Sequence, residues 1–342
     1  MSPTTPLRDA ERFCRDILPG VSRTFAISIK VLPGQLGRAV LSAYLLCRIA
    51  DTVEDDQAMA PEAKAALLDR LLAAFDDAAA SEAYPTHAAT VQGDATHVQL
   101  VQHTHLVFRL WRDLPPASAA AVRKWVEEMG RGMKSFVLRY PHGIRIQTLD
   151  EYRKYCYYVA GTVGYMLTDL WRANQRAITP AVYDALWSRS REFGEALQTV
   201  NILKDVAVDA ERENSIYIPE ELLRAQGSSQ AQILDPALET ANHTALTELI
   251  RMAWANLDAA RDYLLLVPRR ALPIRLFCIL PLLFAYATLR DLTRSRAMLR
   301  SGGNVKITRR EVKQLMVLGI LVAGSNTGVR WLVARVRSAP TA

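Results

Sequence analysis

Cysteine is scarce in this sequence, and its four occurrences show no regular spacing. Cys14, Cys47, Cys156 and Cys278 are far apart, and no Cys-x-x-Cys pair is present. A disulfide-rich secreted domain would need a closely spaced framework, so the pattern predicts reduced thiols in a cytoplasmic protein. The polar segment 1–9 agrees with this prediction, because a secretory leader would continue into an apolar stretch.

Long hydrophobic runs are also lacking. The longest one covers residues 276–289, which is 14 residues, whereas a helix that crosses a bilayer needs about 18 or more. We therefore interpret this run as a buried core helix. Residues 315–333 are apolar too, but polar residues and a glycine interrupt them, so we expect this stretch to rest on a membrane surface at most. The sequence thus predicts a soluble protein or one peripheral to the inner face of the membrane.

The charge is moderately basic and is not concentrated in one segment. The net charge is +7, which favours anionic partners such as diphosphates or acidic lipid surfaces. Neither a zinc-ligand spacing nor a run of interleaved aromatic and basic residues is present. We therefore expect no nucleic-acid partner.

Alternating strand patterns are nearly absent, and helical periodicity dominates the chain. Half of the residues are hydrophobic and only 16 are glycine, a composition typical of a compact helical protein. Segment 81–97 is the best loop candidate, and residues 211–219 form a second break. We predict one all-α domain over residues 1–342, a large helical bundle whose central helices surround an active-site cavity. The expected helices cover about 35–56, 61–80, 98–113, 117–138, 148–173, 180–211, 236–265, 270–297 and 308–336.

Two pairs of aspartates are the most informative feature of the chain. Asp51 with Asp55, and Asp205 with Asp209, stand four residues apart inside apolar helical patterns. At about 100° per residue, four steps return to nearly the same side of a helix, so both carboxylates of a pair share one face. Two such faces turned toward each other would form a cage of oxygen ligands. Such a cage suits Mg²⁺, which takes one or two carboxylates, several waters and substrate phosphates.

A third pair shows why one such spacing alone is weak support. Asp258 and Asp262 repeat it with Arg261 beside them, and we interpret them as a solvated helix face. The first two pairs differ because each is embedded in apolar helix and has one basic neighbour, Arg48 or Lys204. Either cation could pair with the carboxylates or with a diphosphate.

Further polar side chains flank the acid pairs. Residues 22–25 precede the first acidic helix and offer two hydroxyls and a guanidinium for phosphate oxygens. The alternative interpretation is a helix N-cap followed by a surface arginine. Gln198 and Asn201 lie on the same helix face as Asp205, where they could serve a substrate or only the packing.

Three tyrosines occur within four residues, at Tyr155, Tyr157 and Tyr158, and small residues follow them. The small residues allow a neighbouring helix or a substrate to approach closely. Aromatic stripes usually belong to a core, yet an aromatic wall near a metal cluster also suits a carbocation reaction, because ring faces stabilise cations without attacking them. The apolar helix with Phe277 and Pro281 could complete such a wall.

Together these residues resemble the squalene and phytoene synthases, a family of head-to-head prenyl transferases, and the squalene synthase branch most of all. The resemblance covers roughly residues 15–315. It rests on passages in the family's order and spacing, which makes chance similarity very improbable. These passages are VSRTFA (21–26), DTVEDD (51–56), YCYYVAG (155–161), QTVNILKD (198–205), FCILP (277–281) and VKI (305–307).

The resemblance implies an isoprenoid synthase fold and a Mg²⁺-dependent condensation of two farnesyl diphosphates to presqualene diphosphate, which NADPH then reduces to squalene. It also implies peripheral membrane contact for product release as an open option. The acids that match the Mg²⁺ ligands are Asp51, Glu54, Asp55, Asp205 and Asp209.

The resemblance also implies roles for other side chains. Tyr155 matches a tyrosine implicated in proton removal, and Phe277 and Pro281 match positions associated with the second half-reaction. Lys306, together with Arg309 and Ser22, corresponds to the NADPH side of the site. The residues expected along the substrate are Ser22, Arg23, Thr24, Phe25, Tyr44, Arg48, Gln198, Asn201 and Lys204.

Three departures from the family pattern affect these expectations. Val208 stands where the second motif usually carries an acid, and Lys204 replaces an arginine and lacks its two-pronged donor geometry. Thr308 stands where a second basic residue is common, which weakens the expected NADPH contact. No C-terminal membrane anchor like that of eukaryotic relatives is present in the sequence, which predicts a bacterial-type soluble enzyme.

Two alternatives to squalene synthase stay open. One is the same fold without the reductive step, giving presqualene diphosphate, dehydrosqualene or phytoene; the VKI passage with Lys306 favours reduction. The other is a catalytically silent helical partner protein, against which the intact aspartates argue. The oligomeric state and the prenyl chain length are left open as well.

Overall fold

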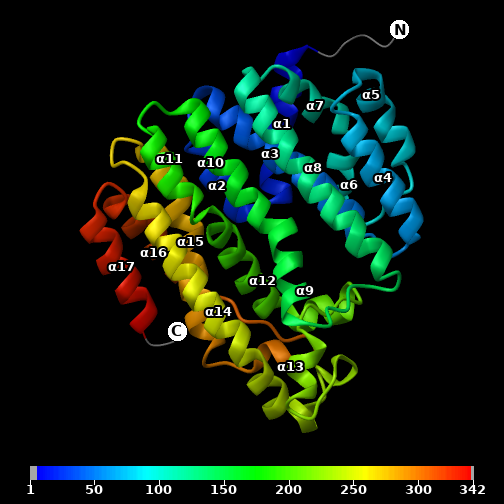
Figure 1. Cartoon of the computed structure of the whole chain (residues 1–342), viewed down its shortest axis with the longest axis vertical. Helices are drawn as coiled ribbons and strands as arrows, with labels where there is room; N and C mark the ends of the chain where they lie inside the picture. Colours follow the sequence, from blue (N-terminus) through cyan, green and yellow to red (C-terminus); the bar gives the residue numbers. More distant parts are fainter. Residues whose placement is uncertain (1–5, 340–342) are drawn as a thin grey trace. The chain divides into compact units, whose positions relative to one another are not determined.

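Helices and the turns between them make up the structure, a computed structural model that describes residues 6–339 (Figure 1). Within these residues, strand pairing is limited to one isolated bridge between Arg145 and Ile216. The all-α prediction is therefore confirmed. The chain divides into two compact units, which we call unit 1 (Met1–Pro141 with Met166–Arg176) and unit 2 (His142–Tyr165 with Ala177–Ala342).

Unit 1 is organised around one long buried helix. This helix, α3, packs against α1, α7 and α8, and nearly all of its side chains from Leu36 to Glu54 are buried or half-buried. Pro33 precedes it, and Gly34 at its first position has a φ of +53°, a left-handed conformation that favours glycine. The helices of unit 1 are α1 (Leu7–Val21), α2 (Arg23–Lys30), α3 (Gly34–Glu54), α4 (Pro61–Ala73), α5 (Ala78–His87), α6 (Ala95–Val101), α7 (Thr104–Arg112), α8 (Pro116–Arg139) and most of α10 (Thr162–Asn174).

Unit 2 is organised around α12, which packs against α14, α15 and a π-helical turn at Tyr157–Gly161. The turn follows α9 directly and leads into α10. The apolar helix α15 lies in the interior, as expected for a core helix. The helices of unit 2 are α9 (Leu149–Cys156), α11 (Pro180–Trp187), α12 (Ser190–Arg212), α13 (Glu220–Arg224), α14 (Glu239–Leu266), α15 (Leu272–Leu292), α16 (Arg309–Val322) and α17 (Asn326–Ser338), with 3₁₀ turns at Gln230–Gln232, Pro236–Leu238 and Ala297–Leu299.

Several long helices expected from the sequence are in fact interrupted. The region 308–336 forms two helices, because Ser325 accepts a hydrogen bond from the Gly328 N–H and starts α17 as an N-cap. The prediction of a loop over residues 81–97 is also wrong. Most of it is helical, since Asp77 and Asp94 cap α5 and α6 through the N–H groups of Ala79 and Thr96, each at 2.8 Å. The expected helices 98–113, 148–173 and 180–211 are likewise divided.

Close helix contact explains the small residues after the tyrosines. Gly194 on α12 lies against the carbonyl of Ala160, and Gly164 lies against the carbonyl of Ser190. A Cβ atom at either glycine would overlap the facing oxygen, so only glycine permits this approach. The residues after Tyr158 therefore admit a neighbouring helix, which is one of the two roles expected for them.

The third acid pair is not a solvated face. Asp258 is half-buried and accepts hydrogen bonds from Tyr286 at 2.9 Å, Arg261 at 3.1 Å and Arg337 at 3.1 Å. It thus joins α14 to α15 and α17, which the sequence spacing did not indicate. Asp262 is more exposed, and within residues 6–339 it forms an ion pair with Arg261 alone.

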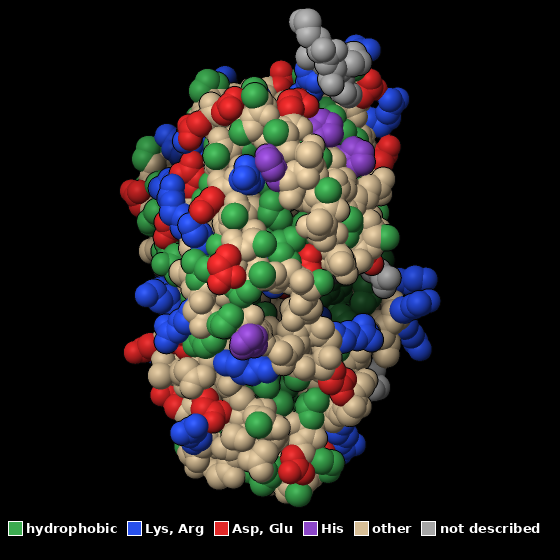
Figure 2. Space-filling model, turned by 90° about the vertical axis from the view of Figure 1, so that its right-hand side faces the viewer, with side chains coloured by type: hydrophobic (Ala, Val, Ile, Leu, Met, Phe, Trp, Pro, Cys, Tyr) green, Lys and Arg blue, Asp and Glu red, His purple; other side chains and the backbone are tan. Residues whose placement is uncertain are grey.

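Charges of both signs are spread over the surface. On the face that Figure 2 shows, basic and acidic side chains are interspersed with uncharged surface.

One helix among the described residues, α15, is long and apolar enough to cross a bilayer. However, 72% of its most apolar window is buried inside the protein.

The contact at Gly194 yields a prediction. Gly194→Ala should lower the free energy of unfolding by about 2 kcal/mol, because α12 must shift away from the backbone of Ala160. Gly324→Ala is the control, since nothing lies within 4 Å of its added Cβ, and its effect should stay within about 0.5 kcal/mol. Urea denaturation measures both. Equal stability of the two variants would contradict the packing role of Gly194.

Candidate functional site

The first acid cluster lies at the C-terminal end of α3. Asp51 and Glu54 are in its last turn and Asp55 caps it, where the helix dipole presents its negative end. Arg48 lies 3.4 Å from Asp51, and each of these two side chains is 28% exposed. Burial raises the pKa of Asp51, and Arg48 offsets this only in part. A bound cation would therefore stabilise the charged forms of these three acids at the C-terminal end of α3.

A chain of contacts holds Arg48 in position. Its Nη2 donates to the Tyr44 hydroxyl at 3.3 Å, and this hydroxyl donates to the carbonyl of Val21 at 3.3 Å. The ring of Phe25 lies 5.7 Å from that of Tyr44, and Ser22 accepts from the Phe25 N–H at 3.1 Å. Unit 1 therefore brings Ser22, Phe25, Tyr44 and Arg48 together beside Asp51, and their expected contact with substrate stays a prediction.

The segment around Ser22 also bears on one alternative. Ser22 is the N-cap of α2, so the N-cap part of the alternative interpretation is confirmed, whereas its surface arginine is not tested. That role does not exclude a contact with substrate, because a hydroxyl can accept more than one hydrogen bond. The side chains of Arg23 and Thr24 lie outside the described part of the structure.

Sequence reasoning missed Lys64 on α4. Its ammonium donates to the carbonyl of Glu54 at 2.6 Å, and burial lowers its pKa while Glu54, Asp55 and Asp56 raise it. This cation satisfies the end of α3 and faces the acid cluster. No signal in the sequence links it to the acids, because it lies ten residues after Glu54 with a turn between them.

Asp56 has a different role from its neighbours. It is 3% exposed, and its carboxylate accepts the N–H groups of Ala58 at 2.8 Å, Met59 at 3.2 Å and Gln92 at 2.8 Å. These bonds hold the turn after α3 against residue 92. The last acid of the DTVEDD passage is therefore structural.

The second acid cluster lies near the C-terminal end of α12. Lys204 contacts Asp205 at 2.9 Å, and both side chains are about one-third exposed or less. Asp209 follows one turn later, and Val208 beside it is half-buried. Glu213, four residues after Asp209, faces Asp205, since burial and the Asp205 charge both raise its pKa. Sequence reasoning overlooked Glu213, although the four-residue spacing continues to it.

The amides and tyrosines near α12 differ in exposure. Gln198 is half-buried and Asn201 is exposed. Tyr155 is 4% exposed, and its ring stacks on that of Tyr217 at 5.0 Å. The ring of Tyr157 lies 5.2 Å from the guanidinium of Arg191. The π-helical turn begins directly after Cys156, and such turns occur often at functional sites.

The expected NADPH residues lie on a connection tied to α12. Glu211 accepts hydrogen bonds from Ser301 Oγ and, at 3.1 Å, from the Gly302 N–H. Lys306 follows on this connection and is exposed, as is Arg309 at the start of α16. Thr308 accepts from the Glu311 N–H at 3.2 Å and caps α16, which accounts for a threonine in place of a basic residue.

Phe277 and Pro281 lie one turn apart on α15 and are buried. Phe277 is 2% exposed. Their burial is compatible with an apolar wall, and their contact with substrate stays a prediction. The prediction that both acid clusters share one cavity joins residues of different units and stays a prediction.

The donor chemistry of each cluster fits Mg²⁺. Among residues 6–339, no three His, Cys, Asp or Glu side chains are grouped closely enough to hold a metal ion by themselves. Mg²⁺ does not need such a group, because it takes one or two carboxylates together with waters and phosphate oxygens. Each cluster offers carboxylates and a neighbouring cation, Arg48 or Lys204, which suits a magnesium diphosphate.

Comparison with known sequences gives a consistent result. A sequence model of the squalene/phytoene synthase family matches residues 18–311. "Squalene synthase BSS" of Botryococcus braunii is 29% identical over 285 residues, 82% of this chain and 59% of that protein. "Squalene synthase" of Schizosaccharomyces pombe is 28% identical over 311 residues, 90% of this chain and 64% of that protein. This chain therefore spans about three-fifths of the length of these relatives.

Solved structures show the same fold. A complex of TcSQS with a ligand matches with a TM-score of 0.81 and 25% identity over 98% of this chain and 93% of that one. A dehydrosqualene synthase matches with a TM-score of 0.62 and 18% identity over 92% of this chain and 96% of that one. The isoprenoid synthase fold expected from the sequence is thereby confirmed.

The neighbouring aspartates 51 and 56 should respond oppositely to substitution. Asp56→Ala leaves three backbone N–H groups without their acceptor and should cost about 2–3 kcal/mol of stability. Asp51→Asn should keep or raise stability at pH 7, because the raised pKa of Asp51 means that its charged form is disfavoured in the folded state.

The gain in Asp51→Asn should disappear as the pH falls below about 4, where the carboxyl is protonated in both folded and unfolded chains. Denaturation curves at several pH values measure this. A loss of stability in Asp51→Asn at pH 7 would show that Asp51 serves the fold.

Proposed function

Because this chain belongs to the squalene/phytoene synthase family, we propose that it is a prenyl transferase of the squalene synthase type. It condenses two farnesyl diphosphates head to head to presqualene diphosphate, with loss of one diphosphate and one proton. NADPH-dependent reduction then gives squalene and the second diphosphate. The observation that carries the proposal is the pair of acid clusters at the C-terminal ends of α3 and α12, each with its own cation.

Mg²⁺ would be held by Asp51, Glu54 and Asp55 on α3 and by Asp205 and Asp209 on α12. When bound, it neutralises the diphosphate and so makes it a better leaving group. Burial of Asp51 beside Arg48 supports this role, because a desolvated carboxylate near a helix C-terminus gains most from a bound cation.

The cations next to the acids would bind the diphosphate itself. Arg48 has one Nη near Asp51 and the other on Tyr44, so its guanidinium is already oriented. Lys204 offers a single ammonium in the corresponding place on α12. Ser22, with Arg23 and Thr24, would add donors to phosphate oxygens, and Gln198 and Asn201 would lie near the reacting carbons. Phe25 and Tyr44 would flank the first prenyl chain.

Tyr155 would take part in the loss of the proton that closes the cyclopropane. Its phenol sits in a buried aromatic setting with Tyr217, which excludes water from a carbocation. The proton would leave the tertiary cation for the phenol or for the diphosphate paired with it. The surrounding ring faces would stabilise the cation.

The reductive step would use the connection that leads into α16. Lys306 and Arg309 are exposed cations, and they fit a phosphate group near the N-terminus of this 14-residue helix. NADPH, when bound there, supplies a hydride. Phe277 and Pro281 would keep the second cation in a dry, apolar place until it is reduced.

One observation favours the non-reductive alternative, in which the chain makes dehydrosqualene or phytoene. Thr308 caps α16 and provides no positive charge where a second one is expected, so the NADPH contact depends on Lys306 and Arg309. A silent partner protein is disfavoured, because both acid clusters keep their carboxylates and cations. We place the enzyme in the cytoplasm, in keeping with its four free, buried cysteines.

Replacing Tyr155 should separate its role from that of Tyr157. Tyr155→Phe should lower the rate of presqualene diphosphate formation by about 100-fold or more, because the proton acceptor is lost. Tyr157→Phe keeps the ring beside Arg191 and should retain most activity. Single-turnover assays with radiolabelled farnesyl diphosphate measure the first step. A normal first-step rate in Tyr155→Phe would make this residue part of the wall only.

Replacing Lys306 should affect only the second step. Lys306→Ala should leave presqualene diphosphate formation unchanged and raise the NADPH concentration needed for squalene by about tenfold, the loss of one phosphate contact. Mass spectrometry of products from farnesyl and geranylgeranyl diphosphate, each with and without NADPH, measures both steps. An identical product mixture with and without NADPH would refute the reductive reaction and favour dehydrosqualene or phytoene synthesis.

A further inference from the structure

Two interhelix turns of unit 2 are joined at one end of the unit. Arg275 on α15 is fully buried and donates to the carbonyls of Leu264 at 3.1 Å and Val267 at 2.6 Å, in the turn between α14 and α15. It also donates to the carbonyl of Ala323 and, at 2.8 Å, to Asn326, in the turn between α16 and α17. One guanidinium thus satisfies both turns and holds them as a single rigid platform.

Large apolar side chains are exposed around this platform. Leu266 and Leu272 flank the first turn with exposures of 37% and 42%. Leu321 at 74% and Ile320 at 53% end α16, and Trp331 at 52% lies in the second turn of α17. Five of the eight exposed large hydrophobic residues in the described chain therefore belong to one end of unit 2. Such a concentration marks a surface that binds something apolar.

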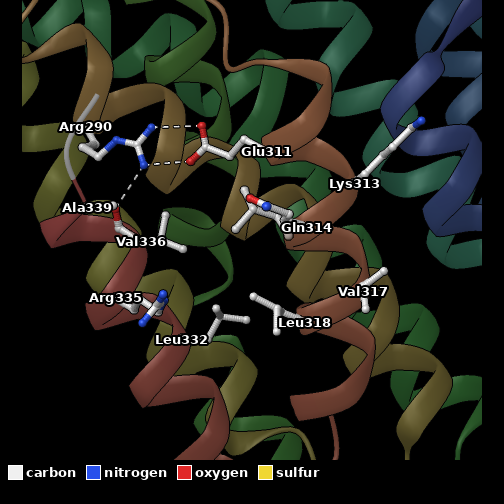
Figure 3. A pocket seen from close by; sticks show the side chains of 11 residues that line it. Arg290, Glu311, Lys313, Gln314, Val317, Leu318, Leu332, Arg335, Val336 and Ala339 are labelled. Carbon is white, nitrogen blue, oxygen red and sulfur yellow. Dashed lines mark hydrogen bonds and ion pairs between the residues drawn. The ribbon is translucent and has the colours of Figure 1, made fainter. Parts of the chain in front are cut away.

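The two helices that meet at the platform are basic. Residues 309–338 contain six basic residues and one acid, a net charge of +5. Arg330 lies at the platform beside Trp331, whereas the other five basic residues lie toward the opposite ends of α16 and α17. The acid, Glu311, pairs with buried Arg290 at 2.8 Å (Figure 3). Arg337 pairs with Asp258. The charge that faces outward is thus almost wholly positive.

Several of these cations have no acidic partner in the described structure. No ion pair among residues 6–339 involves the exposed side chains of Arg269 and Arg270 in the first turn, or of Lys313, Arg330 and Arg335. Lys313 lines the groove of about 580 Å³ between α16 and α17, in the part of α16 away from the platform (Figure 3). Unneutralised cations next to exposed leucine, isoleucine and tryptophan are typical of surfaces that bind anionic lipid.

We propose that this end of unit 2, the platform with Leu266, Leu272, Ile320, Leu321 and Trp331, docks on the surface of an anionic bilayer. The apolar side chains enter the headgroup region, and Arg269, Arg270 and Arg330 contact lipid phosphates. A second copy of the chain is disfavoured as the occupant, because it would set two positive surfaces against each other. Helices α16 and α17, of 14 and 13 residues, are too short to span a bilayer, so the platform contacts its surface only.

The inference stands apart from the proposed reaction, because it rests on exposed side chains and charge outside the acid clusters. If the proposed function holds as well, the platform places an enzyme with a hydrocarbon product against the phase that dissolves it.

Vesicle co-sedimentation of the full chain tests this docking. The protein should bind phosphatidylglycerol–phosphatidylcholine vesicles, bind phosphatidylcholine alone much more weakly, and dissociate at high salt. Arg269→Gln/Arg270→Gln should lower the partition coefficient by about tenfold or more, and Ile320→Asp/Leu321→Asp should do so as well. Mg²⁺-dependent diphosphate release without vesicles should be unchanged in both variants.

Two matched variants control for exposed charge and exposed apolar area elsewhere. Arg8→Gln/Lys30→Gln removes two exposed cations of unit 1, and Leu138→Asp changes a leucine that is 47% exposed. Both should bind vesicles like the unchanged protein. Docking through this platform is overturned if the unchanged protein ignores anionic vesicles, or if the controls lose binding as much as the platform variants. Dimerisation in light scattering that Ile320→Asp/Leu321→Asp abolishes, without vesicle binding, would assign the surface to a second copy.

Discussion

The central constraint on this molecule is that carboxylates lie at the C-terminal ends of two helices, where the helix dipole disfavours negative charge. Asp51 and Asp55 end α3, and Asp209 lies in the last turn of α12, where the helix dipoles are negative. Burial makes the position of Asp51 still more unfavourable, as its raised pKa shows. Evolution for stability alone would put lysine or arginine there. In the proposed reaction, Mg²⁺ would supply positive charge to these carboxylates, and the diphosphate would pair with the neighbouring cations Arg48 and Lys204.

Each unit supports its acids through contacts that are specific to this chain. In unit 1, Tyr44 holds Arg48 beside Asp51, and Lys64 satisfies the end of α3. In unit 2, α12 approaches the π-helical turn so closely that Gly194 is required, and Glu211 ties the connection before Lys306 to the same helix. The geometry of Asp205 and Asp209 is therefore coupled through α12 to the Tyr155 segment and to the expected NADPH residues, all within unit 2.

Local patterns were predictable from the sequence, whereas contacts between distant residues were not. Helical periodicity and the four-residue acid spacing depend on one helix at a time, so the all-α fold and the acid pairs could be inferred. Lys64 could not, because it meets Glu54 only after the chain turns back. The prediction that Asp258 belongs to a solvated helix face was wrong for the same reason, because Tyr286 and Arg337 contact it from other helices. The break before α17 depends on the Ser325 cap, a local signal that the long apolar pattern obscured.

The account is tested most directly by diphosphate release from farnesyl diphosphate in the presence of Mg²⁺. It predicts that Asp51→Asn and Asp205→Asn, although folded, lose activity by about 1,000-fold, because the ionisation of the substrate depends on the metal at each cluster. Asp69→Asn, which removes a 55% exposed helix acid paired with Lys134, should release diphosphate at the normal rate. Near-normal release by Asp51→Asn or Asp205→Asn, or an equal loss in Asp69→Asn, would contradict the assignment of these acids to metal binding.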